Sequence, residues 1–478
     1  MNFNGAITRR SIRAASRGGV VLLCVAIIGA RPTDPHPDWS MFGWDVGRSS
    51  APEVDMRITR KNLRTLQKQA VAIDGTVDGS AIYLHAVSIG GATHDAFFVT
   101  TTYGKTLAID ADRGTVLWEY TPLSYGDLAG SRQITTATPV ADPGRESIYA
   151  ASPDGMIHKL AVADGREEWS TAITRLPRRE KIPSALAFFR GRVIATTGGY
   201  IGDAPPYQGH VAILDATTGR LEHVWNSLCS DRPALIDPES CKESDSAIWG
   251  RAGAVIDSSS GDLFVATGNG RWDGQTNWGD AVIELDPDAT RIMGNYTPTN
   301  TAQLDADDAD LGSTSPVLLG DGLIAQGGKD ALIRLLDLAT IRGTTPHKGG
   351  EIQAVSTPSG GRLFTAPAVR HIGAVTWLFA ADNAATSAWT VTGRRLHPAW
   401  DVRKAGTSPV VVDGMLFVYD PGGGLNVYDA ATGTDLAALE CGSGHWNSPI
   451  VVDGRVALPE GNANAHRTSG VFNIWRLP

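Results

Sequence analysis

Several side chains suited to proton transfer, charge stabilisation or metal binding stand in the middle of this sequence. An aromatic residue, Trp249, and an amide, Asn269, fall near the ends of two neighbouring predicted strands. An acidic run that contains Asp308 and Asp310 follows, and Lys329 comes after the next predicted strand pair. A carboxylate can accept a proton or, together with an amide oxygen, bind a hard cation, and an ammonium group stabilises negative charge.

Each of these residues also has a purely structural interpretation. Asn269 lies between two glycines, where it would serve as a turn residue. The acidic run at 305–310 would serve as a solvated loop, and Lys329 with Asp330 as a surface ion pair. Trp249 would pack only against neighbouring strands. The residue types alone leave both interpretations open.

The elements that would position these residues are short strands. Ala252, Ala254 and Ile256 alternate with polar or small residues, a polar turn follows, and Leu263–Ala266 runs back. This pattern predicts a strand pair that ends in a glycine-rich loop.

A phrase of the same kind recurs along the chain: a glycine, an alternating apolar strand, a turn and a second strand. It spans Gly104–Trp118, Gly155–Trp169 and Gly209–Trp225, and it begins again at Gly424 without the tryptophan. We interpret the recurring tryptophans and alanines as packing residues between repeats rather than as catalytic groups.

A second phrase, a small residue followed by proline and an apolar strand, precedes the first. It occurs at Pro139, Pro316, Pro367, Pro409 and Pro449, and the last three prolines are 42 and 40 residues apart. Four short strands in about 40 to 45 residues are typical of a propeller blade.

Eight such units start near residues 80, 135, 182, 250, 312, 364, 405 and 445, and the third carries a long insertion at about 227–248. The sequence therefore predicts an all-β, eight-bladed β-propeller. The last unit runs out at the C-terminus, so we expect a strand within Leu63–Ile73 to close the ring.

The first 30 residues are typical of an export signal, because a basic leader precedes an apolar run that is too short to span a bilayer comfortably. The segment Thr8–Arg13 is similar to a twin-arginine signal, and an ordinary secretory signal is the alternative. We expect cleavage, a linker at 31–38, and one propeller domain at 39–478. The expected location is periplasmic or extracellular, with no transmembrane span after cleavage.

The net charge and the cysteine content limit the classes of ligand and cofactor that we expect. The formal charge of -9 argues against a nucleic-acid ligand. In an oxidising compartment Cys229 and Cys241 would form a disulfide, with two free thiols as the alternative, and Cys441 has no obvious partner. No Cys-x-x-Cys-His motif occurs, so no covalent haem is expected.

The repeat phrase, with the opening Asp38–Asp45 and the segment Ile58–Leu63, resembles the quinoprotein (PQQ) alcohol dehydrogenase-like propellers. The resemblance covers about residues 38–478. Ala150–Gly155, Pro206–Val211 and the stretch from Ile248 are closest to polyvinyl-alcohol-dehydrogenase-like members. The non-catalytic scaffold lipoprotein of outer-membrane assembly shares the repeat.

The resemblance implies a pyrroloquinoline quinone on the central axis. By motif, Trp249 matches the aromatic platform under the quinone, and Lys329 matches the cation that binds a quinone carbonyl oxygen. Arg132 matches a basic residue at the rim of the cofactor. The redox chemistry would belong to the cofactor, and the protein would position it.

The resemblance also implies a calcium or lanthanide ion beside the quinone. Asn269 matches an amide ligand of the metal, and Asp308 matches the general base next to it. Asp310 falls where lanthanide-using relatives add a second carboxylate. The glutamate ligand of the family is absent from its expected place, and Asp203 or Gln208 lies near that point.

The family's adjacent cysteine pair, which covers the other face of the quinone, is missing. The leading hypothesis is an exported oxidoreductase that transfers hydride from a small or polymeric alcohol to the quinone and passes electrons to a separate acceptor protein. The alternative is a non-catalytic propeller that binds a protein or polymer as a scaffold in the cell envelope.

Overall fold

The computed structural model describes Met1 and residues 36–478. Apart from Met1, the expected signal at 1–30 and the first part of the expected linker, 31–35, lie outside the described residues. The part from His36 to Pro478 forms one compact unit. Among the described residues, no helix combines the length and apolarity needed to cross a bilayer.

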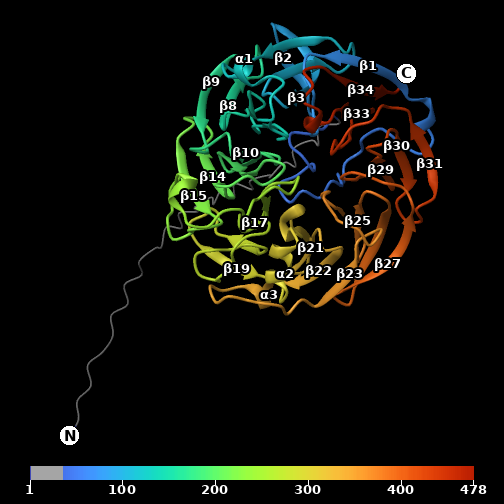
Figure 1. Ribbon diagram of the computed structural model, residues 1–478. Helices are drawn as coiled ribbons and strands as arrows, with labels where there is room; N and C mark the ends of the chain where they lie inside the picture. Colours follow the sequence, from blue (N-terminus) through green and yellow to red (C-terminus); the bar gives the residue numbers. More distant parts are fainter. Residues whose placement is uncertain (2–35) are drawn as a thin grey trace. The chain divides into compact units, whose positions relative to one another are not determined.

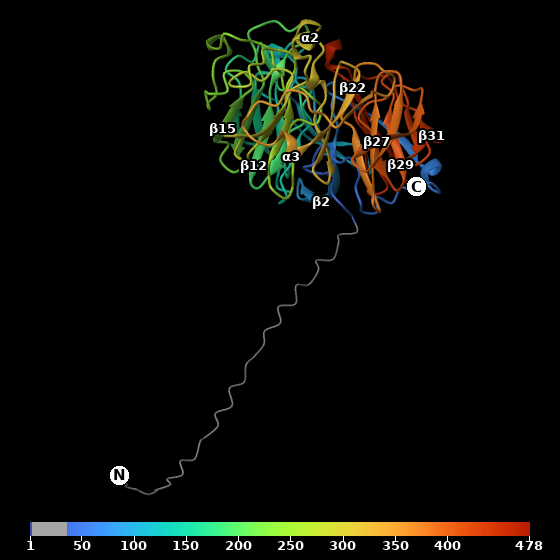
Figure 2. The same ribbon diagram turned by 90° about the horizontal axis from the view of Figure 1, so that it is seen from below.

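Eight sheets of four antiparallel strands stand around a central axis, and we call each sheet a blade (Figures 1 and 2). Blade 1 contains β2 (Ile82–Ile89), β3 (Ala92–Thr100), β4 (Thr106–Asp110) and β5 (Val116–Tyr120). Blade 2 contains β6 (Val140–Ala141), β7 (Ser147–Ala151), β8 (Met156–Ala161) and β9 (Glu167–Ala172). Blade 3 contains β11 (Ala187–Phe189), β12 (Arg192–Thr196), β14 (His210–Asp215) and β15 (Leu221–Asn226). Blade 4 contains β16 (Val255–Ile256), β17 (Leu263–Ala266), β18 (Val282–Leu285) and β19 (Ile292–Tyr296).

Blade 5 contains β20 (Val317–Gly320), β21 (Leu323–Gly327), β22 (Leu332–Asp337) and β23 (Gln353–Ser356). Blade 6 contains β24 (Ala368–Ile372), β25 (Val375–Ala381), β26 (Thr386–Thr392) and β27 (Arg395–Val402). Blade 7 contains β28 (Val410–Val412), β29 (Met415–Tyr419), β30 (Leu425–Asp429) and β31 (Asp435–Leu439). Blade 8 contains β32 (Ile450–Val452), β33 (Arg455–Glu460), β34 (Gly470–Arg476) and β1 (Gln67–Ile73). The first strand of every blade begins two to five residues after the start predicted from the repeats, so the eight-bladed fold is confirmed.

The remaining elements are short and lie in the connections. They are α1 (Tyr125–Leu128), α2 (Thr301–Ala306), α3 (Leu338–Ile341), the 3₁₀ turns η1 (Leu63–Thr65), η2 (Pro238–Ser240), η3 (Leu311–Ser313) and η4 (Ala463–Ala465), and a two-stranded ribbon of β10 (Glu180–Lys181) and β13 (Gly198–Gly199).

The ring closes between the two ends of the propeller. β1 pairs with β34 over seven residues, from Gln67 opposite Arg476 to Ile73 opposite Gly470. Figure 1 shows the blue β1 beside the red β34. The predicted closing strand is confirmed, and its pairing covers an edge that blade 8 would otherwise expose.

The tryptophans at the ends of the repeat phrases form joints between blades. The indole of Trp118 donates to the carbonyl of Val162 at 2.8 Å, and a Cβ added to Gly165 would lie 2.6 Å from its ring. Trp169 packs in the same way against Gly219 of the next blade. The interpretation of these tryptophans as packing residues is therefore confirmed.

One strand is shorter than its pattern predicts. The alternation from Ala252 to Ile256 indicates a five-residue strand, but β16 contains only Val255 and Ile256. The chain turns just before it, because Gly253 adopts a φ of 66° and donates to the carbonyl of Gly250 at 2.9 Å. Alternation continues through this turn without strand pairing.

The insertion in blade 3 is held by a covalent link. Cys229 and Cys241 form a disulfide with a Cα–Cα distance of 6.2 Å, and Leu228 and Ile236 pack beside it. Because the chain after the insertion runs directly to Trp249, the disulfide restricts the motion of the segment that leads into the centre of the ring.

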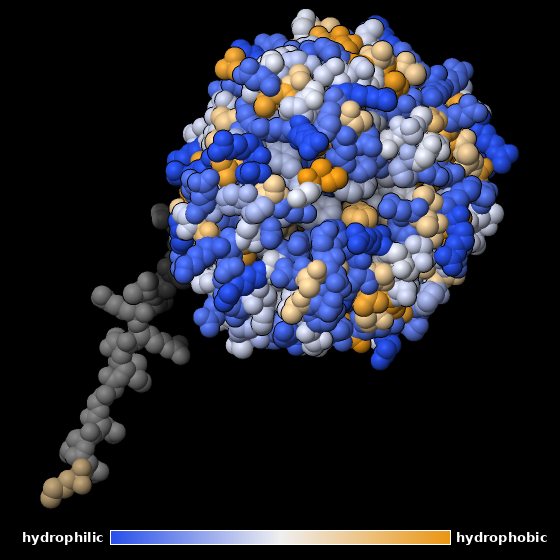
Figure 3. Space-filling model, in the orientation of Figure 1, coloured by the Kyte–Doolittle hydropathy of each residue, from blue (hydrophilic) through white to orange (hydrophobic). Residues whose placement is uncertain are grey.

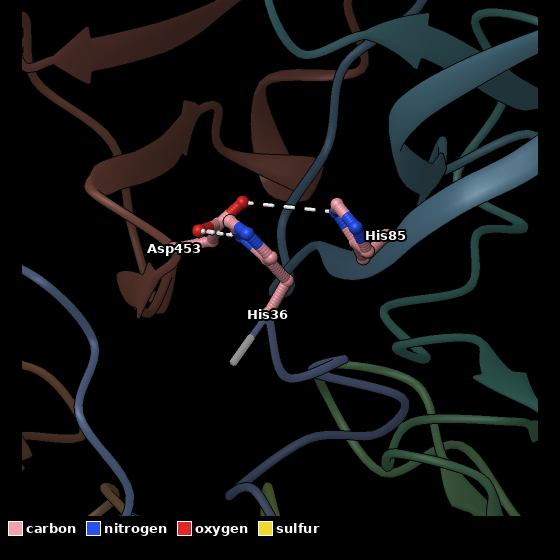
Figure 4. A group of neighbouring side chains, drawn as sticks. All are labelled: His36, His85 and Asp453. Carbon is pink, nitrogen blue, oxygen red and sulfur yellow. Dashed lines mark hydrogen bonds and ion pairs between the residues drawn. The ribbon is translucent and has the colours of Figure 1, made fainter. Parts of the chain in front are cut away.

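Asp453 joins the start of the described chain to the closing blade (Figure 4). Its Oδ1 lies 2.7 Å from Nδ1 of His36 and 2.9 Å from a guanidinium nitrogen of Arg57, and its Oδ2 accepts from Arg455 at 2.9 Å. The ring of His85 stacks on that of His36 with centroids 4.4 Å apart. Two guanidinium groups already neutralise this carboxylate, so we interpret the group as a structural clamp rather than a metal site.

Candidate functional site

A cavity of about 410 Å³ lies at the centre of the ring, and loops from several blades line it. The loop after α2 reaches the middle of the face seen in Figure 1. The same face is hollowed near its centre and mostly hydrophilic around the hollow (Figure 3). Six residues singled out from the sequence line this cavity: Arg132, Asp203, Trp249, Asp308, Asp310 and Lys329.

Lys329 and two aspartates form the charged side of the cavity. Nζ of Lys329 lies 2.7 Å from Oδ1 of Asp308 and also pairs with Asp310. The side chains of Lys329 and Asp310 are 10% and 4% exposed, whereas that of Asp308 is 54% exposed. Burial lowers the pKa of Lys329, but the nearby Asp310 and Asp308 carboxylates outweigh it and raise that pKa above its usual value. Lys329 is therefore a permanent cation with an accessible carboxylate beside it.

An aromatic wall faces these charges. Nζ of Lys329 lies 5.4 Å from the centroid of the Trp249 ring. The Trp249 ring lies 6.0 Å from that of Phe364 and 5.9 Å from that of Trp446, and Phe364 stacks on Trp446 at 5.7 Å. Three rings from blades 4, 6 and 8 thus meet at the axis and offer a broad apolar surface to a planar ligand.

Sequence reasoning missed Phe364 and Trp446, although a signal for both was present. In most blades, the residue four positions before the first strand lines the central cavity. These residues are Asp78, Thr136, Pro183, Arg251, Ser313, Phe364, Gly406 and Trp446, and all except Ser313 and Gly406 line the cavity. Aligning the eight repeats on their first strands would have identified the lining.

Asp78 fixes the position of Trp446 and its neighbour. Its carboxylate lies 2.7 Å from Nδ1 of His445 and accepts from the backbone amides of Trp446 at 3.1 Å and Ala463 at 2.9 Å. Burial raises the pKa of Asp78, but His445, Arg251 and the Ala463 amide outweigh it and hold that pKa at about 2. Asp78 is therefore an anion in the folded protein at neutral pH.

The part of the cavity around Asp78 is otherwise cationic. A guanidinium nitrogen of Arg251 donates to the backbone carbonyl of Asp78 at 2.6 Å, and its guanidinium carbon lies 5.5 Å from the Trp446 ring centroid. Burial lowers the pKa of Lys181 to about 8, and the charge of Asp78 offsets this effect only in part. Both cations lack a side-chain ion pair among the described residues and can attract a negatively charged ligand.

Asn269 contributes to the site differently from the sequence expectation. It does not line the cavity; instead its backbone amide donates to Oδ1 of Asp310 at 2.8 Å. No described residue hydrogen-bonds to its side-chain amide. Asn269 therefore orients Asp310, and its amide oxygen is still available for another ligand.

Asp280 adds a further buried carboxyl group behind Asp310. Its Oδ1 accepts from the Leu311 amide at 2.9 Å, and its Oδ2 is buried without a partner in the described part of the chain. Burial, with the nearby charge of Asp310, raises the pKa of Asp280 to about 8. Asp280 is thus mostly uncharged at neutral pH. The carboxylates of Asp308 and Asp310 still outnumber the single ammonium group of Lys329, so this oxygen-rich corner fits a hard cation such as calcium or a lanthanide.

Asp203 also lines the cavity, on the loop between β13 and β14. Its Oδ1 accepts from the Tyr207 hydroxyl at 2.9 Å. Burial raises the pKa of Asp203, and the charges of Asp310 and Asp308 raise it further. Gln208, the other candidate from the sequence, is fully buried and does not line the cavity.

Comparisons with known proteins agree with this architecture. A PQQ-type repeat family model, described as outer membrane protein assembly factor BamB, matches residues 84–227. The europium-containing methanol dehydrogenase structure superimposes with a TM-score of 0.70 at 15% identity, over 93% of this chain and 99% of that one. At that identity the likeness shows the fold alone.

Two curated relatives carry the sequence likeness. Quinohemoprotein alcohol dehydrogenase ADH IIB of Pseudomonas putida is 25% identical over 316 residues, which cover 58% of this chain and 44% of that protein. Polyvinylalcohol dehydrogenase of Sphingopyxis sp. (strain 113P3) is 21% identical over 228 residues, 45% of this chain and 33% of the relative. The chain thus spans less than half the length of these relatives. It is an eight-bladed propeller of PQQ-type repeats, distantly related to quinoprotein alcohol dehydrogenases and to polyvinylalcohol dehydrogenase.

Proposed function

We propose that the protein is a quinoprotein-type oxidoreductase that oxidises an alcohol with bound pyrroloquinoline quinone. The observation that carries this proposal is the convergence of Trp249, Asp308 and Lys329 on one central cavity, although they are far apart in the chain. When bound, the quinone supplies a two-electron oxidant that accepts the hydride of the alcohol carbon.

The residues of the chain divide the remaining work. Trp249, with the adjoining rings of Phe364 and Trp446, would hold a planar cofactor by stacking. The permanent charge of Lys329 would stabilise negative charge on a cofactor oxygen. Asp308, whose side chain is 54% exposed, would accept the hydroxyl proton of the alcohol.

A hard cation would complete the negative corner. Asp203, Asp308 and Asp310 line the cavity, and the charges of Asp308 and Asp310 act on the Asp203 carboxyl group. The side-chain amide of Asn269 has no described partner. These oxygen donors suit calcium or a lanthanide. Phe364 and Trp446 broaden the aromatic surface in a chain that lacks the family's adjacent cysteine pair.

We further propose that the protein acts outside the cytoplasm and passes electrons to a separate acceptor protein. The Cys229–Cys241 disulfide supports an oxidising compartment, and the basic, then apolar, start of the sequence is typical of an export signal. The sequence has no Cys-x-x-Cys-His motif that could attach a haem to receive the electrons.

Titration of the purified protein with pyrroloquinoline quinone, with and without calcium or a lanthanide, tests the proposal. We expect saturable one-to-one binding by absorbance and calorimetry, which is lost in Trp249→Ala. Trp377→Ala, which removes an indole from β25 away from the cavity, is the matched control and should bind normally. Failure of the wild-type protein to bind under all these conditions would reject the oxidoreductase.

A non-catalytic scaffold is the second candidate. The BamB family model, which matches residues 84–227, favours it, as does the missing cysteine pair. This candidate predicts that the central cavity binds no quinone and that Asp308→Asn leaves all activities of the protein unchanged.

A further inference from the structure

A second cavity, of about 690 Å³, adjoins the central one, and we call it the annex. The two share five lining residues: Arg132, Tyr200, Ile201, Asn464 and His466. Arg178 and Arg179, from the segment before β10, line only the annex. A ligand in the central cavity can therefore extend into the annex without crossing a wall of the protein.

The annex is basic although the chain as a whole carries a formal charge of -9. Three arginines and a histidine line it, and no aspartate or glutamate does. The central cavity, in contrast, is lined by aspartates as well as by arginines and lysines. A concave surface with charges of one sign raises the local concentration of ligands of the opposite sign.

The arginines of the annex also lack side-chain partners. In the described part of the chain, six guanidinium groups make no hydrogen bond, ion pair or ring contact: those of Arg132, Arg178, Arg179, Arg362, Arg395 and Arg467. Four of these line the two adjoining cavities, namely Arg132, Arg178, Arg179 and Arg362. Every other guanidinium group among residues 36–478 contacts a carboxylate, a carbonyl or an aromatic ring. Unpaired guanidinium groups around one cavity are the arrangement that binds carboxylate, sulfate or phosphate.

His466 supplies an independent indication at the junction of the two cavities. It follows η4 with a φ of 54°, and its Nδ1 is buried without a partner among the described residues. A buried ring nitrogen without a hydrogen bond is costly unless a ligand or water satisfies it. The junction thus combines unpaired cations with an unsatisfied polar atom.

We propose that the substrate is an alcohol that carries an anionic group, with that group bound by Arg178 and Arg179 in the annex. This inference rests on the proposed function. The hydroxyl end lies in the central cavity, where the carbon gives its hydride to the quinone and the hydroxyl proton passes to Asp308. A carbonyl forms, and the anionic group is unchanged by the reaction.

The test uses the full-length mature protein and ω-hydroxycarboxylates of increasing chain length, each paired with the 1-alkanol of equal length. With quinone and cation bound, we expect kcat/KM to be at least about tenfold higher for the hydroxycarboxylate at the best length, because a charge-assisted hydrogen bond is added. Arg178→Gln with Arg179→Gln should remove this preference and leave the rate for the alkanol unchanged. Arg395→Gln, which removes an unpaired arginine from β27 instead, is the matched control.

Direct calorimetry separates this inference from the proposed function, because it needs no turnover. Without quinone, the wild-type protein and Arg395→Gln should bind the hydroxycarboxylate, and the double variant should bind it about tenfold more weakly. Equal binding by all three proteins, or equal kcat/KM for acid and alkanol, would overturn the inference. Loss of quinone binding in the double variant would also overturn it, because these arginines would then hold the carboxylates of the cofactor. If the annex binds the acid but no quinone binds, the proposed function fails and the anion site stands.

Discussion

Nζ of Lys329 lies 2.7 Å from Oδ1 of Asp308, although the two residues approach the axis on different loops. The ammonium group is nearly buried, whereas the carboxylate is about half exposed. The pair therefore joins a fixed positive charge to a carboxylate that a ligand can reach, an arrangement that would suit the general base proposed above.

Replacing the accessible carboxylate should stop turnover and spare cofactor binding. We expect Asp308→Asn to lower kcat by about 10² to 10⁴, since a positioned base contributes about that factor. Dye-linked alcohol oxidation measures kcat, and the absorbance spectrum of the loaded protein reports the quinone. Asp307→Asn changes the exposed neighbouring carboxylate and should keep wild-type activity. Wild-type turnover by Asp308→Asn would exclude this residue as the base.

Replacing Lys329 with a neutral residue should destabilise the fold, because the Asp310 carboxylate loses its counter-ion. Lys329→Met leaves the nearly buried Asp310 without its counter-ion, and we expect a loss of about 3 kcal/mol in the free energy of unfolding. Denaturant titration measures it. The double variant Lys329→Met with Asp310→Asn should recover part of the loss, because the uncompensated charge is gone; no recovery would show that the ion pair is not its origin.

Asp78 should give the protein an acid-sensitive component of stability. The pKa of Asp78 is about 2 in the folded protein, below the ordinary 3.8. The ionised carboxylate therefore stabilises the fold above about pH 4, and this contribution of about 2 kcal/mol declines as the pH falls from 4 towards 2. Denaturant titrations across this range should show the decline in the wild type and not in Asp78→Asn. Parallel pH profiles for the two proteins would contradict this role.

Packing at the blade joints can be separated from backbone strain. Gly165 has a φ of 73° and contacts the Trp118 ring, whereas Gly191 has a φ of 78° and no atom within 4 Å of the place that a Cβ would occupy. Gly191→Ala should cost about 1 to 2 kcal/mol through the left-handed backbone alone. Gly165→Ala should cost about 1 to 3 kcal/mol more, because the Trp118 ring must move. Thermal and denaturant unfolding of the two variants measure the difference, and equal losses would argue against the joint.

A bound cation should stabilise the negative corner of the cavity. Calcium or a lanthanide should raise the melting temperature of the cofactor-free protein, because a ligand that binds only the folded state adds its binding free energy. A chelator should reverse the shift, and Asp310→Asn should reduce it. Magnesium at equal concentration controls for ionic strength. An identical melting temperature with and without every cation would show that the corner needs no metal.

The fold could be predicted from the sequence because each blade repeats a local pattern. The eight predicted repeat starts located every first strand to within five residues, and the missing outer strand of blade 8 pointed to the segment that contains Gln67–Ile73. Local alternation failed only at β16, where the turn at Gly253 interrupts the strand.

The cavity was less predictable, since its neighbours come from blades that are distant in the chain. Resemblance identified Trp249, but only the closed ring brings Phe364 and Trp446 against it. Asn269 illustrates another limit: its position in the loop was recognisable, but its bond to Asp310 through the backbone depends on how blades 4 and 5 meet.

The pairing of β1 with β34 also governs how the chain reaches its native state. Residues 67 and 476 face each other, so the contact of greatest sequence separation within the sheets is also the one that completes the last blade. During synthesis β1 emerges first and has no partner until β34 follows, and loop-closure entropy makes such a distant pairing slow. Nascent chains of this protein therefore remain open rings with an unpaired edge until their final strand is made, and that interval is when they most need a chaperone.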